Sequence, residues 1–112
     1  MSKTVYDGNG EPIKDLPNRP GDAIVHTQEL FAALCTHYGM RTIEVRGLGC
    51  RDSRRLGMVR RCIAHTMHVD FGVSLSEIGR CMHLHHTSVM YQVRKAKEIP
   101  AFAERAAKVG AA

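Results

Sequence analysis

Apolar residues recur every three or four positions over most of the chain, a spacing that predicts amphipathic helices. We expect the first helix to begin with Asp22 as its N-cap and to stop at Gly39. Its inward face is marked by Ile24, Thr27, Phe31, Leu34 and Tyr38. The pattern thus places one long helix in the first third of the chain.

The middle of the chain predicts a short turn, a loop and a second long helix. Thr42 can cap a single helical turn that Gly47 ends, and residues 47–57 form a loop rich in arginine. The helix that follows should run to about Phe71, where Gly72 closes it. Its inward positions are Val59, Ile63, Met67 and Phe71, and Arg60 and Arg61 lie in its first turn.

The segment 74–97 predicts two short helices joined by a tight turn. Ser74 and Glu77 have the spacing of a capping box, so a helix should start there. Its apolar stripe consists of Leu75, Ile78, Cys81 and Met82. Only His83, Leu84 and His85 remain for the turn, and the next stripe consists of Val89, Val93 and Ala96. This arrangement is typical of a helix-turn-helix.

These elements indicate an all-α protein with one small domain. Residues 1–21 contain three of the four prolines and no helical periodicity, so we expect a flexible arm. Residues 22–109 should form the helical domain, in which Pro100 starts a last short helix to about Lys108. Residues 110–112 should fray.

Hydrogen-bonding side chains gather where the second of the paired helices begins. A helix-turn-helix places this end of its second helix in the major groove of DNA. There His85, His86, Thr87 and Ser88 could contact base edges. The segment therefore favours a protein that binds double-stranded DNA.

The same segment resembles the C-terminal DNA-binding domain of the bacterial replication initiator DnaA. The family's S-L-x-E-I-G helix is matched from Ser74 to Gly79, its D-H-T-T-V by the run that ends at Val89, and its R-K by Arg94 and Lys95. Residues 34–47 look like its first two helices, and residues 51–61 take the place of its basic loop, so the likeness covers residues 23–99. The initiator's ATPase motif, G-x-x-x-x-G-K-[ST], is missing from this sequence.

The resemblance implies a helix-turn-helix fold of the kind found in the DnaA C-terminal domain and Trp repressor, and a division of roles. One of Arg51, Arg54 and Arg55 would enter the minor groove. The DNA backbone would be held by Arg60, Arg61, Arg94 and Lys95. The chain departs from the family in the turn, which is one residue shorter and has His85 in place of an aspartate that contacts bases. A histidine can donate a hydrogen bond where an aspartate only accepts, so the preferred base should differ.

Charge supports a nucleic-acid partner. Residues 41–61 contain seven arginines and two acidic residues, so they carry the whole net charge of +5. Arginine suits bidentate phosphate contacts and narrow minor grooves. A solvated charged loop is the alternative for such a cluster taken alone.

Other classes of function stay as alternatives. The cysteines Cys35, Cys50, Cys62 and Cys81 lack C-x-x-C spacing and suggest core thiols in a reducing cytoplasm. A zinc site built from Cys62, His65 and His68 with Cys81, His83, His85 and His86 is conceivable but has unusual spacing. A hydrolase is disfavoured because no serine or cysteine lies on a strand-to-helix elbow.

We therefore expect a transcription or replication regulator of chromosomal, phage or mobile-element origin. It would have no cofactor, no membrane contact and no small-molecule substrate, and it could act as a monomer, a homodimer or with a protein partner. A protein-interaction adaptor that reuses the fold is the main rival. Such an adaptor would have lost the base-contacting side chains, which here are retained.

Overall fold

Five α-helices form the body of the protein in its computed structural model, which describes residues 4–49 and 51–103. In chain order they are α1 (Thr27–His37), α2 (Thr42–Val45), α3 (Ser53–His65), α4 (Leu75–Met82) and α5 (His86–Ala96). The described residues contain no β-strand, only an isolated bridge between Tyr6 and Pro12. The expected all-α class is confirmed at this level.

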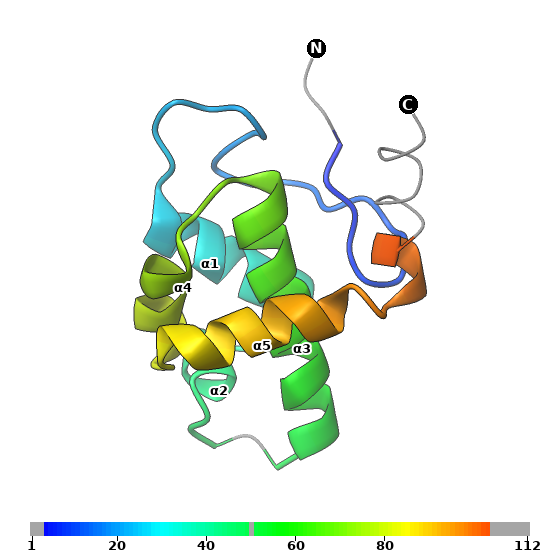
Figure 1. Ribbon diagram of the computed structural model, residues 1–112, viewed down its shortest axis with the longest axis vertical. Coiled ribbons are helices and arrows are strands. Elements are labelled where there is room, and N and C mark those ends of the chain that lie inside the picture. Colours follow the sequence, from blue (N-terminus) through cyan, green and yellow to red (C-terminus); the bar gives the residue numbers. More distant parts are fainter. Residues whose placement is uncertain (1–3, 50, 104–112) are drawn as a thin grey trace.

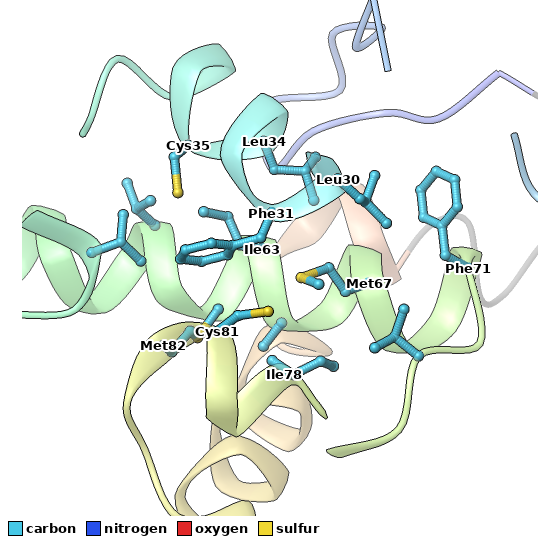
Figure 2. Close-up of a cluster of buried hydrophobic side chains, with 14 of the residues drawn as sticks. Leu30, Phe31, Leu34, Cys35, Ile63, Met67, Phe71, Ile78, Cys81 and Met82 are labelled. Atoms are coloured by element: carbon cyan, nitrogen blue, oxygen red, sulfur yellow. The ribbon is translucent and has the colours of Figure 1, made fainter. Parts of the chain in front are cut away.

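The long helix α3 lies at the centre of the molecule. Figure 1 shows α5 crossing in front of α3, with α1 and α4 beside them. Leu30, Phe31 and Leu34 of α1 are fully buried, as are Ile63 of α3 and Ile78 of α4. Figure 2 shows these side chains meeting in one cluster, with α1 and α4 on opposite sides of α3. Phe31, Leu34, Ile63 and Ile78 are positions that the periodicity predicted to face inward, whereas Leu30 was not among them.

The first helix begins later than the sequence suggested. Asp22 does not cap it: its carboxylate accepts hydrogen bonds from the amide of Arg19 (2.8 Å) and the side chain of Asn18 (3.2 Å). Asn18 also donates to the carbonyl of Ile24 and accepts from the amide of His26, the N-cap of α1. Ile24 is consequently outside the helix and 74% exposed. The prediction of a helix from Asp22 was wrong because a side chain eight residues before His26 satisfies these backbone groups.

The loop before α3 is shorter than predicted. Asp52 is the N-cap of α3, and its carboxylate accepts the amide hydrogen of Arg55 at 3.1 Å. Arg54 and Arg55 therefore belong to the first helical turn, while Arg60 and Arg61 lie a turn or more further on. Val59, Ile63, Met67 and Phe71 are all buried as predicted.

The end of this helix widens into a π-helical turn, Thr66–Asp70. Gly72 follows with a φ of +68°, a left-handed conformation that glycine adopts without strain. The ring of His68 then donates from Nδ1 to the carbonyl of Val73 at 2.9 Å. These contacts turn the chain toward α4.

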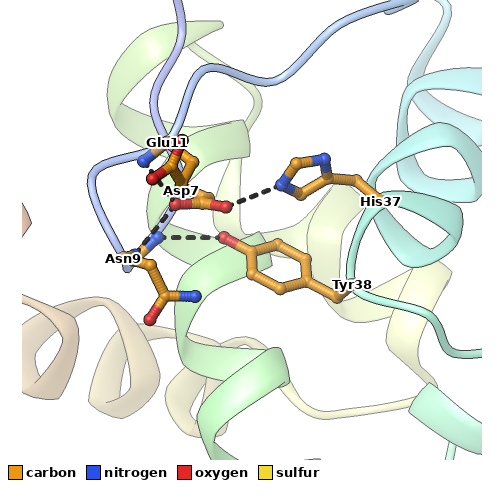
Figure 3. A network of polar contacts seen from close by, with 6 residues as sticks. Asp7, Asn9, Glu11, His37 and Tyr38 are labelled. Carbon is orange, nitrogen blue, oxygen red and sulfur yellow. Dashed lines mark hydrogen bonds and ion pairs between the residues drawn. The ribbon is translucent and has the colours of Figure 1, made fainter.

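The segment expected to be a flexible arm packs against the helices from Thr4 onward. Val5 and Ile13 are buried in the main core. Figure 3 shows how the carboxylate of Asp7 accepts the amides of Asn9 and Glu11, both at 2.9 Å, and lies 2.7 Å from Nε2 of His37 on α1. The N-terminal segment is therefore attached to the end of α1 by both apolar and polar contacts.

The last predicted helix is described only in part. Residues 100–103 are helical, and Phe102 is buried against Cys62 and Ala96. Its ring stacks on that of His65, with centroids 4.1 Å apart. The expected continuation to Lys108 and the frayed tail 110–112 lie outside the described residues.

Candidate nucleic-acid interface

Four consecutive polar side chains are exposed where α5 begins. They are His85, His86, Thr87 and Ser88, which the sequence singled out. The opposite face of α5 is buried through Val89, Val93 and Ala96. The helix is thus anchored along one side and presents its polar first turn to solvent.

His85 is the N-cap of α5. Its Nδ1 accepts the amide hydrogen of Thr87 at 3.3 Å, and the hydroxyl of Thr87 lies 2.8 Å from the same nitrogen. An amide hydrogen can only be donated, so Nδ1 is the acceptor and the neutral ring carries its hydrogen on Nε2. His85 can therefore donate to another molecule from Nε2 while it caps the helix.

The two neighbouring histidines face each other. The ring centroids of His85 and His86 are 4.2 Å apart, with an angle of 36° between the planes. No side-chain hydrogen bond of His86 or Ser88 is found within the described residues. These two side chains are therefore available to a ligand without loss of a contact that holds the fold.

The turn before α5 depends on a close backbone approach. Leu84 donates its amide hydrogen to the carbonyl of Gly79 at 2.9 Å, and a Cβ on Gly79 would collide with the carbonyl oxygen of Leu84. His83 closes α4 with a φ of +58°, the left-handed conformation usual for glycine. Ser74 caps the start of α4 by accepting the amide of Glu77 at 3.2 Å, as the sequence predicted. The cap at Ser74, the left-handed His83 at the end of α4 and the close contact at Gly79 thus set how the chain passes from α4 to α5.

Three of the seven clustered arginines bind carbonyl groups at helix ends. Arg46 donates from Nε to the carbonyl of Cys81 at 2.8 Å, and Arg60 donates from Nε to that of Val45 at 2.7 Å. Arg55 donates from Nη2 to the carbonyl of Tyr38 at 3.1 Å, directly after α1. The last carbonyls of a helix have no partner within it and carry partial negative charge, so a cation is stabilising there. Part of the positive charge therefore stabilises helix ends within the fold.

The other basic residues named from the sequence differ in whether their side chains contact other residues of the fold. Arg51 and Arg54 are exposed before and within the first turn of α3. Arg61 donates from Nε to the side chain of Gln92 at 3.2 Å and so links α3 to α5. Arg94 is exposed on α5, and the ammonium group of Lys95 lies 3.7 Å from the carboxylate of Glu98. Of the three candidates for a minor-groove contact, Arg55 is the one already bound to backbone carbonyls.

Tyr91 is a candidate that the sequence interpretation missed. It follows Thr87 by four positions and Ser88 by three, so it lies on the same helix face, and it is 52% exposed. The ammonium group of Lys95 is 5.9 Å from the centroid of its ring. The helical spacing from Thr87 was the signal that could have identified it.

The residues of the conceivable zinc site are used elsewhere. Cys62 belongs to the small cluster with Phe102, His65 stacks on Phe102, and His68 bonds to Val73. No group of three or more potential metal ligands comes together among the residues that the structure describes. In the same part of the chain, no helix combines the length and apolar character needed to cross a bilayer.

The sequence matches no protein-family model, and the comparisons with curated proteins and with solved structures found no similar protein.

Proposed function

We propose that this protein binds double-stranded DNA in a sequence-specific manner, with the first turn of α5 in the major groove. The observation that carries the proposal is the row of four exposed hydrogen-bonding side chains, His85 to Ser88, on a helix whose other face is buried. Side chains at the start of a recognition helix contact base edges in proteins of this kind.

In this proposal α4, the turn at residues 83–85 and α5 form a helix-turn-helix. The order of the elements, two short helices joined by a three-residue turn, supports this part of the proposal. In this proposal the protein would occupy specific sites on duplex DNA. We infer a cytoplasmic regulator of transcription or replication.

Phosphate contacts would come from arginines that the fold does not already use. Arg51 and Arg54 are exposed, and Arg94 adds a third cation on α5 itself. Arg55 already donates a hydrogen bond to the carbonyl of Tyr38 at the end of α1, so it is the weakest candidate for the minor groove. The DNA-binding charge is therefore smaller than the seven arginines of the sequence suggested.

Selection of bound sequences from a pool of random duplexes tests the proposal. A conserved motif is expected, and its symmetry reports whether a monomer or a dimer binds. Ser88→Ala should weaken binding to the selected site, because the variant lacks a hydroxyl that we expect to contact a base. Its fold and its non-specific binding should be unchanged, because this hydroxyl makes no hydrogen bond within the described residues. If no sequence is enriched from the pool and the protein does not bind duplex DNA, the protein-interaction adaptor would be favoured.

A further inference from the structure

A cleft of about 670 Å³ lies between α3 and the C-terminal end of α5. The loop at Gly8 and the end of α1 at Tyr38 form its other sides. Its volume is within the range of small-molecule sites, which is about 300–1,000 Å³. Lys95, on its wall, is nine residues from His86, or about 13 Å along the helix, so the cleft is separate from the first turn of α5.

Three cations and one carboxylate border this cleft. Arg55 and Arg61 come from α3, and Lys95 and Glu98 from the end of α5. Arg61 uses only Nε to bind Gln92, which fixes the guanidinium and leaves its two terminal nitrogens without a hydrogen-bond partner among the described residues. Such a held guanidinium is suited to bind an anion through two parallel hydrogen bonds.

The rest of the lining is mainly apolar. Met58, Val59 and Ile99 contribute aliphatic surface, and Met58 is 48% exposed although it is apolar. Burial raises the pKa of the Tyr38 hydroxyl and of the Cys62 thiol, so both groups stay neutral at pH 7. The cleft thus combines a positive edge with an uncharged, largely apolar wall.

The fold holds the N-terminal wall in place. The amide of Gly8 donates to the hydroxyl of Tyr38 at 3.3 Å, and the neighbouring Asp7 is fixed by His37 (Figure 3). A Cβ on Gly8 would lie 2.7 Å from the sulfur of Cys62, so only glycine lets the loop approach α3 this closely. A site formed in advance loses less free energy on binding than one that must be ordered.

We propose that this cleft is a binding site for a small organic anion, with one acidic group and an apolar body of one or two ring systems. Inorganic phosphate would leave the apolar wall without a partner. A neutral apolar molecule would cover the guanidinium of Arg61 and deprive it of water. The proposed site does not depend on DNA binding.

Fluorescence titration of the whole protein with 8-anilinonaphthalene-1-sulfonate tests the proposal, because this dye has two ring systems and one sulfonate. Saturable binding of one dye per chain is expected, at least tenfold tighter than that of the neutral analogue N-phenyl-1-naphthylamine. Arg61→Gln should weaken dye binding about tenfold, because a charged hydrogen bond is lost. Arg54→Gln removes the same charge from the same helix outside the cleft and should leave the affinity unchanged.

A second pair of variants keeps the test valid if Arg61→Gln fails to fold. Met58→Glu adds a negative charge at the rim without disturbing the core and should weaken dye binding much more than Met58→Gln. Circular dichroism and melting curves verify the fold of each variant. Equal dye affinity in Arg61→Gln and Arg54→Gln, equal affinity in the two Met58 variants, or equal binding of the neutral analogue would each overturn the proposal.

Discussion

Replacement of His85 by aspartate separates two roles of one side chain. As the N-cap of α5, His85 accepts the amide of Thr87, and we propose that its Nε2 donates to a base. Aspartate is among the best N-cap residues and adds a favourable charge at the helix N-terminus, worth about 0.3–1 kcal/mol. The free energy of unfolding of His85→Asp should therefore equal or slightly exceed that of the original protein. His85→Ala should lose about 0.5–2 kcal/mol of stability, because the cap is removed.

The two variants should differ in DNA binding as well. A donor at this position favours guanine N7 or O6, whereas the carboxylate of an aspartate accepts a hydrogen bond from cytosine N4. A good base contact is worth about 1–3 kcal/mol of discrimination, or about 5- to 150-fold in affinity. His85→Asp should change the preferred base pair at one position of the selected site, and His85→Ala should lose the preference there.

Competition between the selected duplex and its single-base variants measures these preferences, and urea unfolding measures the stabilities. The two measurements together prevent a loss of helix structure from being taken for a loss of a base contact. If all three proteins have the same profile of base preferences, His85 caps α5 and does nothing else. If His85→Asp is as unstable as His85→Ala, the hydrogen bond to Thr87 does not stabilise the helix.

Four further substitutions test charge, packing and pH dependence. Arg54→Ala should flatten the slope of log DNA affinity against log salt concentration by about one unit and leave the free energy of unfolding unchanged. Arg55→Ala should lower the free energy of unfolding by about 1 kcal/mol, because carbonyls at the end of α1 lose their hydrogen-bond donor. Gly79→Ala should cost about 1–3 kcal/mol in urea unfolding, since the new methyl group collides with the Leu84 carbonyl. Burial raises the pKa of Asp7, but its hydrogen bonds lower it more, so the net pKa lies below the ordinary 3.8. The stability gained from this carboxylate is therefore present above about pH 4 and lost as the pH falls further, and Asp7→Asn should remove that part of the acid dependence.

Matched controls make these tests specific. Arg19→Ala removes an exposed cation from the N-terminal segment and should leave the salt slope unchanged. Gly57→Ala places a methyl group on α3 where it meets no neighbour within 4 Å, so it should stabilise the helix slightly. A salt slope in Arg54→Ala equal to that of the original protein, a Gly79→Ala variant as stable as Gly57→Ala, or an Asp7→Asn variant with unchanged acid unfolding would contradict the respective prediction.

The paired helices were the part of the fold most readily predicted from the sequence. The cap at Ser74, the apolar stripes of α4 and α5 and the three-residue turn all lie where the pattern put them. These features depend on groups within four residues of each other, so they are encoded locally. The sequence likewise determined which face of α3 is buried, because helical periodicity alone identifies it; for α1 the predicted inward face included Phe31 and Leu34 but left out Leu30 and Cys35.

The tertiary structure decided what depends on residues far apart in the chain. The start of α1 is set by Asn18, and the clustered arginines Arg46, Arg55 and Arg60 find carbonyls that lie 15 to 35 residues away. No local pattern distinguishes an arginine that will meet a helix end from one that will face solvent, since both have the same side chain and similar neighbours. The same reason hid the cleft at Arg61, whose walls come from four separate segments and exist only once α3 and α5 have packed against each other.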